Sequence, residues 1–183
     1  MAIKTFTVGE VLTASDTNTY LANAGLVYVT STTVGSAVSS VTVSNCFSST
    51  YDNYKIIWQG GTCSASGSGY VQLSGITTSV YYGVLMFYNL AAAAYGAAPD
   101  NPSTSWRYIG GGSSKFGSMN FDICAPNLAT RKTIQAWYSR EGYSGSYTGW
   151  VDSTSSATGF TIGNVDWGTM TGGTITVYGY RKA

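Results

Sequence analysis

The end of the chain carries the pattern that most restricts its fold. Residues 173–180 read GTITVYGY, in which apolar and polar side chains alternate almost to the last position. Alternation with a period of two is typical of a β-strand that is buried on one side and faces solvent on the other. The same pattern recurs after residue 24, where no segment has the periodicity of a helix of ordinary length.

About ten strands are predicted in this way. Gly, Ser, Asn or Pro separates them, which indicates an all-β protein, an antiparallel β-sandwich of the jelly-roll type. The predicted strands cover residues 26–29, 38–43, 54–58, 70–73, 81–88, 116–124, 133–138, 147–151, 160–162 and 174–180.

The first part of the chain follows a different pattern. We therefore expect an N-terminal attachment segment over residues 1–24 and a β-sandwich domain over residues 25–183. Thr13 and Asp16 resemble a helix capping box, which predicts a short helix over residues 14–23 in an otherwise extended segment. A helix of ~10 residues does not persist alone in water, so it must pack on a partner or, as a strap, on its own domain.

Three connections stand out between the predicted strands. Residues 89–105 contain Pro99 and Pro102, which indicate a long loop rather than a strand. Such a loop is either functional or a tolerated insertion. The run of glycines at 110–112 predicts a turn, and residues 141–147 predict an exposed hairpin tip.

Charged residues are scarce. Only 9% of the 183 residues are charged and the net charge is +1, which predicts neither nucleic-acid binding nor attraction to an anionic membrane. The apolar stretch 80–98 is interrupted by Gly83, Asn89 and Gly96, so we expect no membrane insertion. A protein with so few charges tends to associate, either with copies of itself or within a larger assembly. A Ser/Thr-rich secreted domain is the alternative.

Composition also restricts the chemistry. The chain has no histidine, so serine-hydrolase chemistry of the common type and histidine-containing metal sites are excluded, and we expect no metal and no cofactor. The three cysteines, with no CxxC spacing, are expected to be buried free thiols, although one disulfide plus a free thiol is an alternative. Free thiols favour assembly in a reducing cytoplasm.

Glycoside hydrolysis needs only two carboxylates, so it stays open. Asp52 and Asp100 lie in turn-like contexts, where Asp commonly bonds nearby backbone. Glu141 is expected to form a solvated ion pair with the adjacent Arg140. We therefore expect a binding or structural protein rather than an enzyme.

Aromatic residues offer the remaining chemistry. Five tryptophans and fifteen tyrosines provide rings on which the C–H faces of sugars stack, beside polar groups that bond sugar hydroxyls. The alternative is that these rings stabilise the sheet or a subunit interface. Trp58 and Trp137, inside apolar runs, are expected in the core. The candidate glycan-contact residues are Trp106, Arg107, Tyr108, Tyr138, Arg140, Glu141, Tyr143, Tyr147 and Trp150.

Three segments resemble structural proteins of tailed bacteriophages. Residues 6–18, FTVGEVLTASDTN, resemble a short N-terminal motif that precedes a variable β region in such proteins. Residues 39–54 are similar to a segment of phage tail-fibre and minor-tail proteins, and residues 173–179 resemble the last strand of their β-sandwich heads. Together the three segments cover roughly a quarter of the chain, and residues 59–153 match no family.

The resemblance implies a virion surface protein that assembles in the host cytoplasm as a homotrimer. Its N-terminal segment would attach to other virion proteins, and its distal loops would face the host. Because no repetitive shaft separates anchor from head, a compact tail-tip, baseplate or capsid-surface protein is favoured over a long fibre. The implied attachment residues are Phe6, Gly9, Glu10, Leu12, Asp16, Asn18, Tyr20 and Leu21.

Three functions remain as hypotheses. The first is a tail-associated fibre or receptor-binding protein that grips host-surface polysaccharide. The second is a capsid decoration or head-fibre protein with a purely structural role. The third is a small polysaccharide depolymerase.

Overall fold

The computed structural model describes residues 7–16 and 25–182, and in them the chain is almost entirely β-structure. Thirteen strands form one continuous antiparallel hydrogen-bonded sheet, which confirms the predicted all-β antiparallel fold. The strands are β1 (Leu26–Thr33), β2 (Ser40–Val43), β3 (Asn53–Cys63), β4 (Gly67–Leu73), β5 (Tyr81–Asn89), β6 (Ala94–Ser103), β7 (Trp106–Gly112), β8 (Gly117–Cys124), β9 (Lys132–Arg140), β10 (Tyr143–Val151), β11 (Phe160–Asn164), β12 (Met170–Thr171) and β13 (Thr174–Tyr180).

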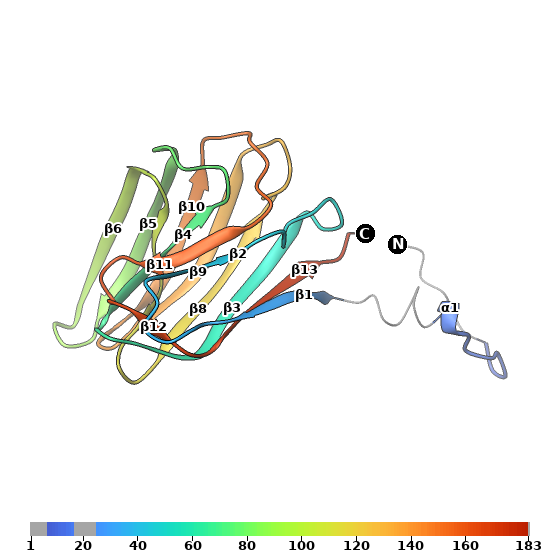
Figure 1. The fold of residues 1–183 in the computed structure, drawn as a ribbon, viewed down its shortest axis with the longest axis horizontal. Coiled ribbons are helices and arrows are strands. Elements are labelled where there is room, and N and C mark those ends of the chain that lie inside the picture. Colours follow the sequence, from blue (N-terminus) through green and yellow to red (C-terminus); the bar gives the residue numbers. More distant parts are fainter. Residues whose placement is uncertain (1–6, 17–24, 183) are drawn as a thin grey trace.

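The sheet folds into two layers (Figure 1). The long layer has the order β1-β13-β3-β8-β9-β10-β5-β6, and the short layer has the order β2-β11-β4-β7. The layers join where β7 pairs with the start of β8, through Gly111 with Ser118 and Gly112 with Gly117. Figure 1 shows β11 crossing the strands of the long layer, as expected for a second layer packed on the first.

Alternation of side chains places the core between the layers. In β9, Ile134, Ala136 and Tyr138 are buried while the residues between them are exposed. Phe160 of the short layer packs edge-on against Phe121 of the long layer, with ring centroids 6.0 Å apart. The Tyr138 hydroxyl lies 2.9 Å from Ser68 Oγ of β4, so a hydrogen bond also joins the layers.

Glycines allow two buried indoles to meet in this core. Trp58 and Trp167 pack edge to face, with centroids 5.4 Å apart. A Cβ at Gly69 would lie 2.2 Å from the Trp167 ring, and one at Gly117 would lie 2.4 Å from the Trp58 ring. The backbone can approach the rings this closely only where there is no side chain.

The prediction of a loop at residues 89–105 is wrong. Most of it is β6, which pairs with β5 and carries Pro99 opposite Val84. β6 is the last strand of the long layer, and a proline without an N–H group is tolerated on such an edge. Pro102 lies in the same edge strand.

Two further predictions about connections need correction. The glycines at 110–112 lie within β7 and are buried, so they are not a turn. The predicted hairpin tip at 141–147 contains a turn only at Glu141 and Gly142, because β10 begins at Tyr143. The short β12, which pairs with β3, had not been predicted.

The described N-terminal residues contain the predicted capping box. The Thr13 backbone N–H donates to Asp16 Oδ2 at 3.1 Å, and the Asp16 N–H donates to Thr13 Oγ1 at 3.0 Å. The helix that follows, α1 (Ala14–Asp16), is described for three residues, and the remainder of the predicted helix lies outside the described residues. In the described part of the chain, no helix has the length and apolarity needed to cross a membrane.

Candidate functional site

One side of the long layer faces away from the short layer, and we call it the outer face. In β8, β9, β10, β5 and β6 the side chains that do not enter the core project from it. Trp137 of β9 is one of these side chains, and 72% of its surface is exposed. Its prediction as a core residue is wrong, because it alternates with the buried Ala136 and Tyr138.

Polar side chains surround Trp137. Asn120 of β8 and Ser146 of β10 lie directly opposite it in the sheet register. The Asn120 side-chain oxygen Oδ1 is buried and has no hydrogen-bond partner among the described residues. A hydrogen-bond acceptor is therefore left unused beside an exposed indole.

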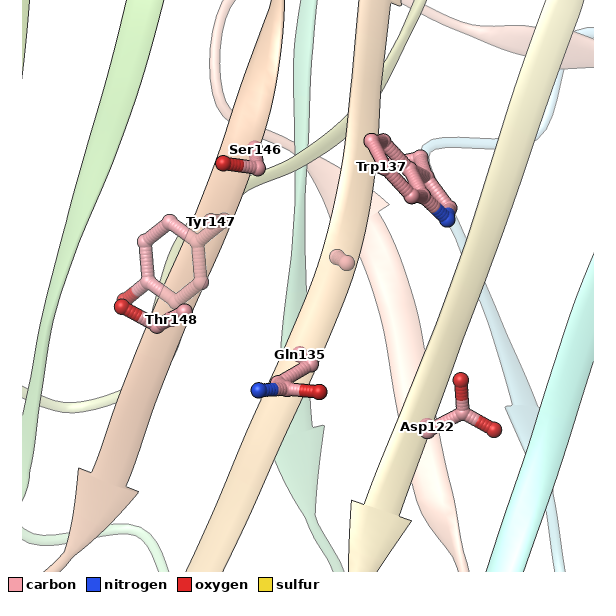
Figure 2. Close-up of a pocket in the computed structure, with 7 residues that line it drawn as sticks. Asp122, Gln135, Trp137, Ser146, Tyr147 and Thr148 are labelled. Atoms are coloured by element: carbon pink, nitrogen blue, oxygen red, sulfur yellow. The ribbon is translucent and has the colours of Figure 1, made fainter.

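A shallow hollow of about 240 Å³ begins at Trp137 and continues along the outer face (Figure 2). Figure 2 shows Gln135 on the same strand as Trp137, Asp122 on one neighbouring strand, and Ser146 and Thr148 on the other. An amide, a carboxylate and two hydroxyls thus form the polar part of its lining. The amide and the hydroxyls both donate and accept hydrogen bonds, whereas the carboxylate only accepts them.

The Asp122 carboxylate is held in place by two donors. Lys55 Nζ lies 3.2 Å from Asp122 Oδ2, and the Tyr180 hydroxyl donates to Oδ1 at 2.5 Å. Burial, and then the Asp122 carboxylate, raises the pKa of the Tyr180 hydroxyl to about 12. The tyrosine therefore stays a donor at physiological pH.

A second aromatic group lies on the outer face. Tyr82 and Trp150 stack with centroids 4.5 Å apart and planes 9° from parallel. The Arg131 guanidinium lies 5.7 Å from the centre of the Trp150 ring and forms an ion pair with Asp152 at 2.8 Å. Stacking and the cation together fix the orientation of the Trp150 indole.

The edge of the outer face is also apolar. Met86 and Tyr95 are exposed, by 57% and 89% respectively, and Tyr95 packs edge-on against Tyr88 at 5.0 Å. These residues and Trp137 line a common hollow, together with Ser139, Ser144 and Ser146. Exposed apolar groups gathered in one place, unlike scattered ones, indicate a contact surface.

Three of the nine predicted glycan-contact residues lie in the core. Trp106 and Tyr147 have no exposed surface and Tyr138 has 3%, so they offer nothing to a ligand. Their prediction as surface groups is wrong because these strand positions point toward the opposite layer.

The polar and flanking members of that predicted cluster lie elsewhere. Arg140 stacks over the Tyr143 ring at 4.1 Å and reaches Asp166 at 3.5 Å, while Arg107 is exposed on β7. Tyr108 lies beneath Arg107, 5.1 Å from its guanidinium. Of the nine residues, only Trp150 lies on the outer face.

The prediction of an ion pair between Glu141 and Arg140 is wrong. Glu141 Oε1 instead lies 2.5 Å from Lys115 Nζ, and both side chains are exposed. This pair belongs to the end of the sandwich, because Glu141 occupies the β9–β10 turn.

Asp100 is buried rather than placed in a turn. It lies in β6 with 3% of its surface exposed, and its Oδ2 accepts hydrogen bonds from the Arg107 N–H and the Tyr147 hydroxyl, each at 2.7 Å. Its Oδ1 is buried with no partner among the described residues. Burial raises the pKa of Asp100 above its ordinary value, although both hydrogen bonds act in the opposite direction.

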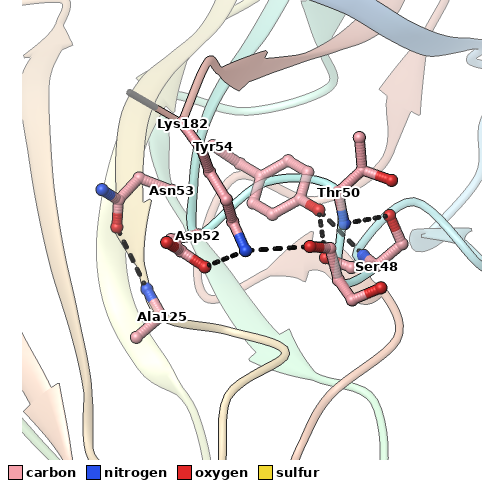
Figure 3. Close-up of polar contacts among 8 residues, drawn as sticks. Ser48, Thr50, Asp52, Asn53, Tyr54, Ala125 and Lys182 are labelled. Carbon is pink, nitrogen blue, oxygen red and sulfur yellow. Dashed lines mark hydrogen bonds and ion pairs between the residues drawn. The ribbon is translucent and has the colours of Figure 1, made fainter. Parts of the chain in front are cut away.

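A polar cluster at one end of the sandwich is structural (Figure 3). Lys182 Nζ lies 2.7 Å from Asp52 and donates to the Ser49 carbonyl at 2.9 Å. The Tyr54 hydroxyl donates to the Ser48 carbonyl and accepts from the Ser48 N–H. Asp52 is thus engaged with the end of the chain rather than only with its own turn.

The carboxylates after residue 24 therefore have assigned partners. Five form ion pairs with a lysine or arginine, and the sixth, Asp100, is buried. Within residues 7–16 and 25–182, no three His, Cys, Asp or Glu side chains come together in a group that could hold a metal ion. All three cysteines are free, and Cys46 and Cys63 are buried as predicted, whereas Cys124 is exposed.

The implied attachment residues fall on both sides of the described boundary. Gly9, Glu10, Leu12 and Asp16 lie in the described N-terminal residues, and the Glu10 carboxylate accepts from the Thr7 N–H at 3.2 Å. The other implied attachment residues, Phe6, Asn18, Tyr20 and Leu21, lie outside the described residues.

No protein-family model matches the chain, and no curated protein is significantly similar to it in sequence. The likeness to phage structural proteins therefore depends on the three sequence segments quoted above.

Proposed function

We propose that this protein is a surface protein of a tailed-bacteriophage virion and that its outer face binds a host-surface polysaccharide. Exposed Trp137 is the observation that carries the binding part of this proposal. Its indole is 72% exposed, with Asn120 and Ser146 opposite it on the two neighbouring strands, and it contributes little to the core. Sugars combine C–H faces, which stack on aromatic rings, with hydroxyls, which bond amide and carboxylate groups.

The surroundings of Trp137 favour a saccharide over other ligands. The hollow is lined by Asp122, Gln135, Ser146 and Thr148, whose oxygen and nitrogen atoms suit a ligand rich in hydroxyl groups. A pocket for a small apolar ligand would instead bury most of the surface of that ligand. The contact surface is therefore a sheet face, not the loops that the sequence had indicated.

The virion part of the proposal is supported by sequence. The motif in residues 6–18 would attach the protein to other virion proteins, with the sandwich as a homotrimeric head. A tail-associated position would bring the protein into contact with the host surface, and a purely structural role on the capsid is the alternative.

A binding role is favoured over a catalytic one by the carboxylates. Glycoside hydrolysis needs an acid and a second carboxylate across the scissile bond, ~5–9.5 Å apart. Asp122 lines the hollow, but it is already bonded by Lys55 and Tyr180. The proposal therefore treats the protein as a non-enzymatic adhesin.

A glycan array of bacterial polysaccharides tests the binding proposal. The wild-type protein should bind at least one saccharide, and Trp137→Ala should weaken that binding by about 5- to 150-fold, the worth of one stacked ring. Tyr28→Ala is the matched control, because Tyr28 is an exposed aromatic at the far edge of the same layer. A wild-type protein that binds no saccharide would refute the proposal. If Trp137→Ala bound as tightly as the wild type, Trp137 would not belong to the binding site.

A further inference from the structure

We infer that the outer face holds two aromatic subsites and takes an extended, uncharged saccharide chain laid along β9 and β10. This inference rests on the proposed glycan binding and adds the length and charge of the ligand. The first subsite is Trp137, and the second is the stacked pair of Tyr82 and Trp150.

The two subsites lie too far apart for one sugar ring. Trp137 is opposite Ser146 of β10, and Trp150 lies four residues further along that strand. Four residues of extended chain span about 13 Å. That distance exceeds the width of a single pyranose ring, so one monosaccharide cannot touch both subsites.

A row of polar side chains, which we call the polar floor, connects the subsites. Gln135 and Thr148 are opposite each other in the register, between the two aromatic groups. Thr148 lines the hollow at Trp137, the hollow at Trp150 and a third hollow of about 400 Å³ between them. Thr133, opposite Trp150, lines the last two as well. Hydroxyl and amide groups therefore run from one subsite to the other.

The charges near this floor are balanced. Lys55 is paired with Asp122 at 3.2 Å, and Arg131 is paired with Asp152 at 2.8 Å. A site that recognises the carboxylate of a uronic or sialic acid usually has a basic side chain that is free to donate a charge-assisted hydrogen bond to it. Since both bases beside the floor already have carboxylate partners, an uncharged saccharide fits it best.

The strands that carry the subsites are held in place before a ligand arrives. β9 is paired on both sides, by β8 and β10, and β10 is paired by β9 and β5. Trp150 is further held by its stacking on Tyr82. Binding to side chains on strands that are already ordered loses less conformational entropy than ordering a flexible loop.

The test is a length series of oligosaccharides on an array. The probes are neutral gluco-, manno- and galacto-oligosaccharides from monosaccharide to hexasaccharide, beside uronic-acid and sialic-acid oligomers of the same lengths. We expect binding of the longer neutral chains and little binding of the monosaccharides. Trp137→Ala and Trp150→Ala should each weaken binding of the longest bound chain by about 5- to 150-fold.

Controls separate this inference from the proposed function. Trp150→Phe, which keeps an aromatic ring, should restore part of the binding, and the melting temperature of each variant shows that it is folded. Loss of binding in Trp137→Ala but not in Trp150→Ala would overturn the two-subsite inference and leave the proposed function standing. Equal binding of monosaccharides and long chains, or tighter binding of acidic chains, would also overturn it. Absence of all binding by the wild-type protein would refute both.

Discussion

Replacement of Trp106 by alanine tests the assignment of aromatic residues to the core or the outer face. The Trp106 side chain is fully buried at the start of β7 and packs edge-on against Tyr81, with centroids 5.2 Å apart. Its Nε1–H donates to the Trp150 carbonyl at 3.3 Å. A Cβ at Gly149 would lie only 3.0 Å from this indole, so the two strands are in close contact here.

The size of the effect follows from this burial. Replacing a buried Trp by Ala lowers the free energy of unfolding by about 3–5 kcal/mol, through lost burial and the cavity that remains. For a protein of this size, 1 kcal/mol corresponds to about 2–4 °C in melting temperature. Trp106→Ala should therefore melt about 6–20 °C below the wild type. Trp137→Ala, at a 72% exposed position, should change the stability by no more than about 0.5 kcal/mol.

Thermal unfolding followed by circular dichroism gives the comparison directly. Urea titration adds the free energy at one temperature and shows whether the transition slope is unchanged. A Trp106→Ala protein that melts within about 2 °C of the wild type would contradict the burial argument. So would a Trp137→Ala protein that is destabilised as much as Trp106→Ala.

Three further predictions concern charge, thiols and the N-terminal segment. Burial raises the pKa of Asp100, so the stability this group provides is fully present below its unfolded pKa of about 4 and is lost as the pH rises through the folded value. The asparagine in Asp100→Asn cannot ionise. Between about pH 4 and neutral pH, urea unfolding should therefore show a smaller loss of stability for this variant than for the wild type. A maleimide should label one thiol in the native chain, detected by mass spectrometry. Cys124 is exposed, whereas Cys46 and Cys63 are buried with pKa values raised to about 12. Deletion of residues 1–24 should leave a folded sandwich that no longer enters virions, measured by thermal unfolding and particle composition.

Each of these predictions has a contrary outcome. If the stability of the Asp100→Asn protein depended on pH as the wild type does, Asp100 would not be the group that causes this dependence. Rapid labelling of all three thiols without denaturant would show that the core around Cys46 and Cys63 opens easily. An unfolded truncated protein would make the N-terminal segment a part of the sandwich rather than an anchor.

Period-two alternation predicted seven of the eight strands of the long layer. The segment 174–180 was predicted as a strand with the bounds that β13 has, and β5, β8 and β9 were found within two residues at each end. β6 was missed because the sequence does not reveal which strand lies at an edge, where Pro99 and Pro102 are tolerated. β7 was missed because its glycines, which allow close packing between layers, resemble a turn.

The candidate site was harder to predict, since an aromatic residue in a strand has the same propensity on either face. In β9 the face could have been read, because Gln135 and Ser139 share the parity of Trp137 and are polar. In β7 it could not, because the burial of Trp106 depends on Tyr81 and Gly149, which are distant in sequence. Only the strand pairing brings Trp137 and Trp150 to one face.

The scarcity of charge and the choice of a sheet face are connected. Within residues 25–182, five ion pairs engage five of the six Asp and Glu side chains, and Lys55 and Arg131 beside the polar floor are both among the paired bases. Attraction of a charged partner over a distance would need an excess of one sign, which this surface does not have. Recognition then depends on short-range stacking and hydrogen bonds, which need groups held at fixed positions. Strands that are paired on both sides hold Trp137 and Gln135 in this way, whereas a loop would first have to be ordered.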